Sequence, residues 1–159
     1  MKLYHTLIFT VFACIIGCKK NNISESQKVK NDLIKAITIG KGDLSGNGEE
    51  GILKSNIVIS NEHDWFELLE KIDVSSDVSS TFSENNIDFG VYTVIASFDD
   101  IKMSGGYSIE ISDLLIIDAE KIIVKIKRAD NGPGRVSSVI TQPFHIVKIP
   151  RWEKSIIFE

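Results

Sequence analysis

Cysteine is almost absent from the chain. Of its 159 residues only two are cysteines, and both Cys14 and Cys18 lie in the first 18 positions. The rest of the sequence therefore offers no disulfide, no cysteine zinc site and no thiol nucleophile. An excess of basic residues is also lacking, because 18 Lys+Arg stand against 22 Asp+Glu and the formal net charge is −4. This balance excludes nucleic acid as the main partner, since binding its phosphates requires clustered positive charge.

The sequence also lacks a hydrophobic run long enough to span a membrane. Its longest run, residues 7–16, falls well short of the roughly 20 residues that a membrane-spanning helix needs. The run follows the basic Lys2 and ends just before Gly17 and Cys18, after which polar residues begin. A basic start and a short apolar core are typical of a signal peptide. The residues that end this core resemble the bacterial lipobox, in which a small residue precedes a cysteine.

The lipobox resemblance implies a chemical role for Cys18. The thiol of such a cysteine takes a diacylglyceryl group as a thioether, and the peptide bond before it is cleaved. We therefore predict a lipoprotein signal peptide over residues 1–17, a lipidated Cys18 with a flexible tether over residues 18–30, and one globular domain over residues 31–159. Cys14 is the weaker candidate because the apolar core would be cut short before it. The alternatives are an ordinary secretory signal and a buried N-terminal helix.

The composition favours a folded chain that is rich in strands. Hydrophobic residues make up 43% of the sequence and charged residues 25%, which suits neither a disordered chain nor a multi-span membrane protein. Isoleucine far outnumbers alanine, and β-branched residues favour strands. Apolar and polar residues alternate strictly over residues 107–112. The full set of predicted strands covers residues 33–39, 52–59, 91–98, 107–112, 121–127, 136–149 and 155–158.

One segment has helical periodicity instead. Four apolar residues fall at helical spacing within residues 62–72: Trp65, Leu68, Leu69 and Ile72. Asn61 precedes them and is a typical N-cap residue, so an amphipathic helix is predicted there. The Ser-rich and acidic residues 73–86 are predicted to form a long, mobile loop. Together these elements predict an α+β domain that is mainly β, an antiparallel sheet or sandwich of about seven or eight strands with one helix.

Few residues offer catalytic or metal-binding chemistry. After cleavage the two histidines are His63, expected on the solvent side of the helix, and His145, expected to pack on a strand face. Neither has the ligand spacing of a histidine or cysteine metal site. No Gly-x-Ser-x-Gly elbow, Walker loop or dinucleotide-binding motif is present. We therefore predict no catalytic residue, no cofactor and no metal, and a protein that is not an enzyme.

We interpret two acidic segments as turns of the chain and not as ion-binding sites. Residues 43–48 superficially resemble a calcium loop, but Lys54 occupies the position where a bidentate acid is needed. A glycine-rich turn is predicted there, with Asn47 and Gly48 at positive φ. Asp99 and Asp100 are interpreted as solvated turn residues.

Three loops remain as candidates for binding another protein. Each contains turn residues beside an aromatic or basic residue at the start or the interruption of a predicted strand. The candidate residues are Ser104, Gly105, Gly106, Tyr107, Gly132, Pro133, Gly134, Arg135, Gln142, Pro143 and Phe144.

The order of these motifs resembles the C-terminal domain of the PrcB family over about residues 90–150. In that family a Gly-Gly-Tyr-Ser strand start, a Pro-Gly loop and a Pro-aromatic-His strand follow one another, as they do here. The family takes its name from a non-catalytic lipoprotein subunit of a surface protease complex. The resemblance therefore implies a lipid-anchored accessory protein of the bacterial cell envelope that binds a protease or another envelope protein. No catalytic residues are implied, and the oligomeric state stays open.

Two alternatives remain open at this stage. The three loops also resemble those of chagasin-type protease inhibitors, although Gln142 replaces a basic residue and Phe144 a tryptophan in the third loop. In that interpretation glycines let the backbone approach a cleft and a Pro-aromatic wedge enters it. In a purely structural interpretation the glycines and prolines only turn strands, and Tyr107 and Phe144 lie in the core. The other alternative is a structural envelope lipoprotein without a specific partner. Lys19, which follows the lipidated cysteine, favours the outer membrane and leaves its periplasmic or surface face undecided.

Overall fold

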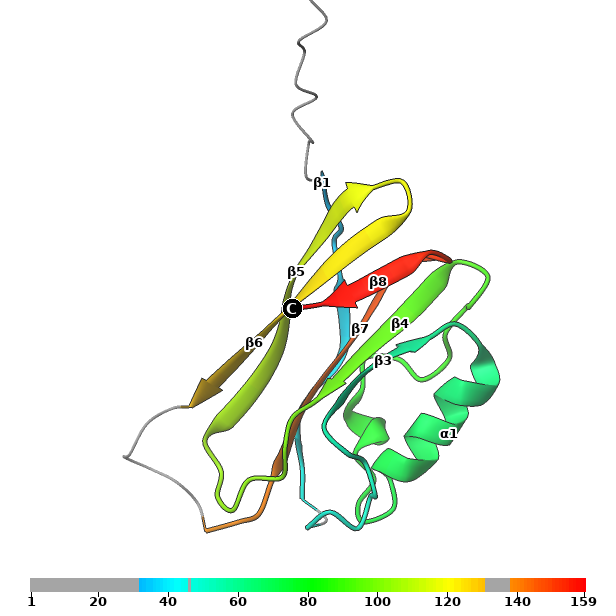
Figure 1. Ribbon diagram of the computed structural model, residues 1–159. Coiled ribbons are helices and arrows are strands. Elements are labelled where there is room, and N and C mark those ends of the chain that lie inside the picture. The colour runs from blue at the N-terminus through cyan, green and yellow to red at the C-terminus, as the bar shows by residue number, and fades with distance from the viewer. Residues whose placement is uncertain (1–31, 46, 131–137) are drawn as a thin grey trace, which may run out of the picture.

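The protein folds as three layers, which are two β-sheets and a layer that contains the helix (Figure 1). The computed structural model describes residues 32–45, 47–130 and 138–159. The predicted signal peptide, the tether and lipidated Cys18 lie outside these residues, as do Gly132, Pro133, Gly134 and Arg135. Within the described part of the chain, no helix is long and apolar enough to span a membrane.

The strands form two four-stranded sheets. The outer sheet has the order β1-β5-β6-β8 and the central sheet has the order β2-β7-β4-β3. The outer strands are β1 (Asp32–Leu33), β5 (Tyr107–Asp118), β6 (Lys121–Asp130) and β8 (Ser155–Phe158). The central strands are β2 (Ile37–Leu44), β7 (Gln142–Pro150), β4 (Tyr92–Phe98) and β3 (Ser55–Ile59). Among the described strands every pairing is antiparallel except that of β6 with β8. The predicted α+β, mainly β class is confirmed.

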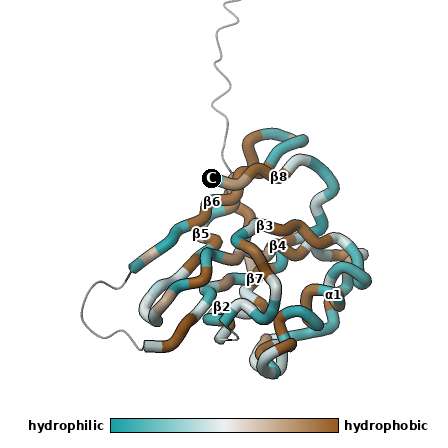
Figure 2. The backbone as a smooth tube through the Cα atoms, turned by 60° about the horizontal axis from the view of Figure 1, so that its bottom comes forward, coloured by the Kyte–Doolittle hydropathy of each residue, from teal (hydrophilic) through white to brown (hydrophobic). Residues whose placement is uncertain are grey.

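The middle strands of the central sheet are buried on both faces. Val94 and Ala96 of β4 pack toward the helix, whereas Ile95 between them packs against the outer sheet. Strand β7 repeats this division with Ile146 and Val147. The outer sheet therefore covers one face of the central sheet, and α1 (Glu62–Ile72) with the following segment covers the other. Figure 2 shows hydrophobic residues on the strands of the central sheet and on α1.

Helix α1 forms as the periodicity predicts. The Asn61 side chain accepts a hydrogen bond from the Asp64 backbone N–H at 2.9 Å, which satisfies one of the free donors of the first turn. The four apolar residues at helical spacing are buried, and Trp65 is fully so. Burial of this face holds the helix in place, because a helix of this length is marginal in water on its own.

The structure adds detail to two predicted segments. The predicted loop over residues 73–86 contains the 3₁₀ helix η1 (Ser79–Thr81), and Asp73 accepts hydrogen bonds from the Ser79 N–H and Oγ. The first predicted strand is divided into β1 and β2, and β2 continues to Leu44. The turn that follows has Asn47 and Gly48 at φ of 56° and 86°, as predicted.

Candidate protein-binding site

Two of the three predicted binding loops meet at one end of the molecule. Lys102 and Thr141 pair through both backbone hydrogen bonds, at 2.7 and 2.9 Å. The Thr141 hydroxyl also donates to the Ser104 carbonyl at 3.2 Å. These contacts join the segment that leads into β5 to the start of β7. Tyr107, the first residue of β5, lies opposite Asp130 at the end of β6.

Residues 142–144, one of these two loops, are buried, which corrects the expectation of an exposed wedge. Gln142, Pro143 and Phe144 do not interrupt a strand but begin β7, and all three side chains are buried. The Phe144 ring stacks on Phe98 at 6.2 Å between centroids, because β4 and β7 pair these two residues directly. The Gln142 amide donates to the backbone carbonyls of Ile52 and Asp99, at 2.9 and 3.0 Å. These residues fix neighbouring segments and do not reach the surface.

Of the two predicted loops that the structure describes, the one before β5 stays accessible. Gly106 has a φ of 93°, a conformation that favours glycine, and this turn directs the chain into β5. Gly105 is buried, whereas Ser104 and Tyr107 are half-buried. The Lys102 ammonium group lies 5.2 Å from the centroid of the Tyr107 ring, a cation–π distance.

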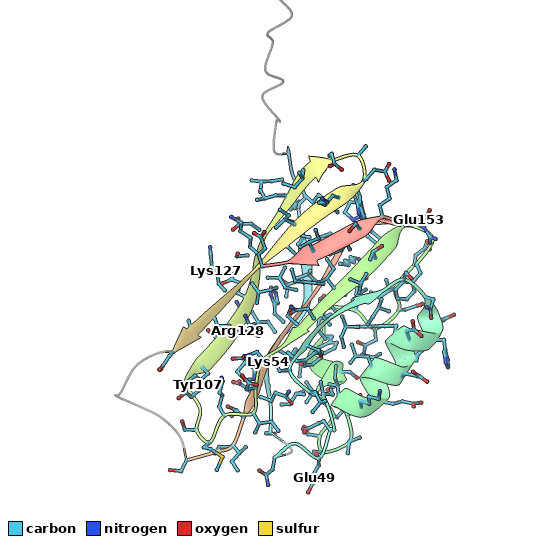
Figure 3. All side chains as sticks on the ribbon, in the orientation of Figure 1. Glu49, Lys54, Tyr107, Lys127, Arg128 and Glu153 are labelled. Atoms are coloured by element: carbon cyan, nitrogen blue, oxygen red, sulfur yellow. The ribbon has the colours of Figure 1, made fainter. Side chains whose placement is uncertain are left out.

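A cluster of charges that the sequence reasoning missed lies beside this loop. Asp99 follows β4 directly and its side chain is only 3% exposed, so it is not a solvated turn residue. Its carboxylate contacts Lys54 at 3.3 Å, Lys102 at 3.1 Å and the Arg128 Nε at 3.0 Å. We call these four residues the Asp99 cluster. They join segments that are far apart in the sequence, and Figure 3 shows Lys54 and Arg128 near each other, with Tyr107 close by.

The cluster keeps its buried carboxylate ionised. Burial alone would raise the pKa of Asp99, but hydrogen bonds from Lys102, the Asp100 backbone N–H and Lys54 outweigh this effect and lower the pKa to about 2. Three cations therefore surround one buried anion, and Asp100 contacts Lys54 from the exposed side at 2.6 Å. The segments that carry these side chains are held in a fixed arrangement.

Large apolar side chains that are exposed lie close in the sequence to residues of the cluster or to Thr141. Leu53 precedes Lys54, Ile101 and Met103 flank Lys102, and Val139 stands two residues before Thr141. Their exposed fractions are 82% for Leu53, 44% for Ile101, 78% for Met103 and 49% for Val139. We call these four residues the apolar rim. Exposed large apolar side chains are a common feature of protein interaction sites.

The comparison with known families concerns this same end of the molecule. Residues 93–150 match the family model described as PrcB C-terminal. We call residues 93–150 the PrcB C-terminal segment, after the family model that they match. Comparison with curated proteins and with solved structures gives no significant match. The resemblance predicted from the sequence is thereby confirmed over nearly the same residues.

The PrcB C-terminal segment spans strands β4 to β7 and contains most of the candidate site. Asp99, Lys102 and Arg128 lie within it, as do Ile101 and Met103 of the apolar rim. Lys54 and Leu53 lie outside it, together with α1. In the sequence, the only signal for this part of the candidate site was the apolar Leu53 next to Lys54. The fold is needed to show which residues lie near them in space.

His145 lies within the PrcB C-terminal segment and is packed, as predicted. Its side chain sits between the sheets, where Nδ1 accepts the Ile111 N–H at 2.9 Å and Nε2 lies 3.0 Å from the Thr38 hydroxyl. Because Nδ1 accepts, the neutral ring carries its proton on Nε2 and donates to Thr38. Burial, reinforced by Lys41 and opposed by Glu110, lowers the pKa of His145 to about 4.

This pKa predicts a loss of stability in mild acid. A histidine titrates near pH 6.5 when unfolded and near 4 here, so between these values the unfolded chain binds more protons and stability falls as the pH is lowered. We expect the free energy of unfolding to decrease by about 2 kcal/mol from pH 7 to pH 5. Urea denaturation at both pH values measures this decrease. In the variant His145→Gln most of the decrease should be absent. An equal decrease in that variant would contradict the assignment.

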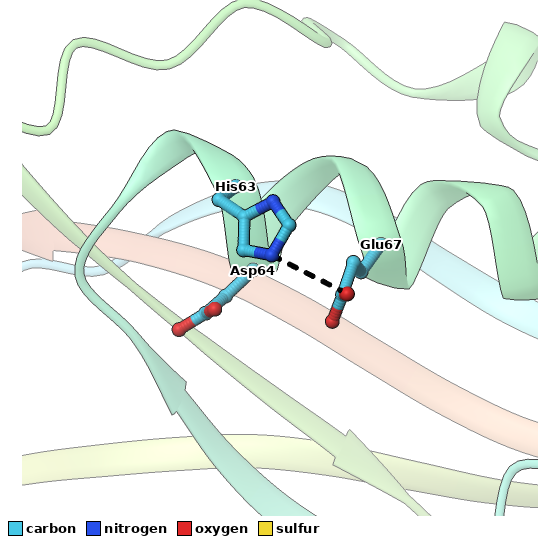
Figure 4. Close-up of side chains that lie close together, drawn as sticks. All are labelled: His63, Asp64 and Glu67. Atoms are coloured by element: carbon cyan, nitrogen blue, oxygen red, sulfur yellow. Dashed lines mark ion pairs between the residues drawn. The ribbon is translucent and has the colours of Figure 1, made fainter.

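One group outside the PrcB C-terminal segment has potential metal ligands. His63, Asp64 and Glu67 lie near the start of α1 with one ligand atom each within 4.8 Å of the others (Figure 4). All three are exposed, and the His63 Nε2 lies 3.4 Å from the Glu67 carboxylate. This is the usual distance of an i, i+4 ion pair on a helix surface. His63 is on the solvent side of the helix, as predicted.

Proposed function

We propose that this chain is a non-catalytic, lipid-anchored protein of the bacterial cell envelope that binds a second protein as an accessory subunit of a protease complex. The PrcB C-terminal segment supports association with such a complex. The lipobox-like residues that end at Cys18 support the anchor, and Lys19 favours the outer membrane. Two acyl chains or more on that cysteine suffice for stable attachment.

The observation that carries this proposal is the apolar rim around the Asp99 cluster. Transfer of apolar surface from water to an interface is favourable by about 25 cal/mol per Å², before the entropic and desolvation costs of association are subtracted. Leu53 and Met103 offer most of this surface, because both are largely exposed. The Asp99 cluster fixes the segments that carry the rim, so little conformational entropy remains to be lost on binding.

A binding role also suits the two described histidines better than a catalytic one. The Nδ1 of His145 already accepts a backbone N–H, and its Nε2 faces Thr38 inside the protein. A general base needs a free ring nitrogen and a pKa near the working pH, whereas the pKa of His145 is about 4. His63 pairs with Glu67 on an open helix surface.

Capture experiments with matched variants test the proposal. The tagged full chain is isolated from detergent-solubilised membranes of its native cells, and co-purified proteins are identified by mass spectrometry. We expect a protease subunit among them, and we expect Met103→Asp to reduce its recovery about tenfold, because a charge in the apolar rim would have to be desolvated. Quantitative mass spectrometry of equal amounts of bait measures the effect.

Two further variants serve as controls. Val74→Asp places the same charge on another exposed apolar residue, beyond the end of α1, and should leave the recovery unchanged. Cys18→Ala should move the chain from the membrane fraction to the soluble fraction. Recovery of no specific protein would refute the proposal and leave a structural envelope lipoprotein. Equal losses in Met103→Asp and Val74→Asp would refute the assigned surface.

A further inference from the structure

Strand β3 forms an open edge of the central sheet. It pairs with β4 from Ser55 to Ile59 and ends the strand order on that side. In an edge strand every second residue directs its backbone N–H and C=O away from the sheet. Among the described residues, no backbone hydrogen bond outside the strand ladder involves residues 55–59. The outward groups of β3 are therefore available to another strand.

The opposite edge of the same sheet is covered. The Ser83 N–H and hydroxyl donate to the carbonyls of Ile39 and Thr38 in β2, at 2.9 and 3.2 Å. The Phe82 ring lies so close to Gly40 that a Cβ atom there would be 2.4 Å from it. The segment after η1 thus occupies the edge of β2, and β3 has no equivalent cover among the described residues.

The sequence of β3 does not protect its edge either. Natural edge strands carry lysine, proline or inward-pointing charges that prevent pairing with other chains. Strand β3 reads Ser-Asn-Ile-Val-Ile and has none of these. Val58 is 40% exposed and offers an apolar side chain beside the open backbone. These features favour recruitment of a strand.

A groove runs beside this edge. It has a volume of about 380 Å³ and lies between β3, residues 51–53 and α1. Its apolar wall includes Ile57, Val58 and Leu68, and its polar wall includes Asp64, Glu67 and Lys71. Figure 4 shows Asp64 and Glu67 on the same side of α1. The acidic pair lies toward the start of the helix and the lysine near its end, so the two ends of the groove carry opposite charges.

We propose that the edge of β3 binds an extended segment of a partner protein by strand addition. The backbone of that segment extends the central sheet, one apolar side chain enters the groove, and a lysine or arginine reaches Asp64 and Glu67. Strand addition takes its affinity from main-chain hydrogen bonds and its specificity from such side-chain pockets. At about 3.3 Å per residue, β3 accommodates about five residues of the partner. The groove lies ahead of the PrcB C-terminal segment, so this inference goes beyond the proposed function.

A random peptide library identifies what the edge binds. A phage-displayed library of twelve-residue peptides is selected on the full chain, and enriched peptides are synthesised. We expect them to combine a basic residue with β-branched residues. Hydrogen–deuterium exchange of the amides of residues 55–59 should slow at least about tenfold when the peptide is bound, because the outward N–H groups become hydrogen-bonded.

Two charge reversals on α1 form a matched pair. Glu67→Lys replaces an acid that lines the groove, whereas Glu70→Lys replaces an exposed acid that does not line it. We expect the dissociation constant, measured by fluorescence anisotropy, to rise about tenfold in the first variant and to stay unchanged in the second. Met103→Asp should leave peptide affinity unchanged, because Met103 does not line the groove, although Leu53 of the apolar rim does.

Three results would overturn the inference. The first is that no enriched peptide slows exchange in β3. The second is an equal loss of affinity in Glu67→Lys and Glu70→Lys. The third is protection of β3 that rises with protein concentration in the absence of peptide, which would identify a second copy of the chain as the occupant.

Discussion

Phe144→Ala is expected to lower the free energy of unfolding by about 3–5 kcal/mol, the usual range for removing a large aromatic side chain from a core. Phe144 is 2% exposed and lies between the rings of Phe98 and Phe82, at centroid distances of 6.2 and 5.9 Å. Its position in β7 joins the central sheet to the segment after η1. The cavity left by alanine would therefore loosen both layers at once.

Urea denaturation followed by circular dichroism measures this effect. Phe66→Ala is the matched control, because Phe66 is 45% exposed on α1 and its removal should cost less than about 1 kcal/mol. The experiment also decides between two roles of the residue. If Phe144→Ala kept its stability yet lost its protein partner, Phe144 would act as a binding wedge and not as a core residue.

The double burial of β7 explains why the sequence alone left this residue open between the core and a binding loop. Periodicity of two identifies a strand and its two faces, but it does not say whether one face or both are covered. Phe144 and His145 point to opposite faces, and the structure covers both. The helix was predicted correctly because its apolar spacing and its cap at Asn61 are local features. Local patterns were sufficient there.

In the candidate site, too, features set by neighbouring residues could be predicted, whereas contacts between distant segments could not. The glycine turn before Tyr107 and its place at a strand start follow from neighbouring residues, and the structure agrees. The Asp99 cluster does not follow from neighbouring residues, because Lys54 and Arg128 reach Asp99 from segments 45 and 29 residues away. A pair of aspartates after a strand is usually solvated, and only the packing of β4 against both layers buries the first of them.

Asp99→Asn is expected to lower the free energy of unfolding by about 3 kcal/mol. Removing one partner of a buried ion pair leaves the other charges uncompensated, at a usual cost of roughly 3–5 kcal/mol. The lower end applies here because Lys54, Lys102 and Arg128 remain partly exposed, at 45%, 22% and 38%. Loosening of the segments that carry the apolar rim should also reduce capture of the partner protein. Urea denaturation at pH 7 and the capture experiment measure the two effects.

The pH dependence of this difference identifies its electrostatic origin. The pKa of Asp99 is lowered to about 2, so its contribution to stability is complete above the unfolded value of 3.8 and is lost as the pH falls through 2. The native chain and Asp99→Asn should therefore converge in stability between pH 4 and pH 2. Asp100→Asn is the control and should cost less than about 1 kcal/mol, because the Asp100 side chain is 54% exposed. A difference that persists unchanged to pH 2 would show that Asp99 acts through packing and not through its charge.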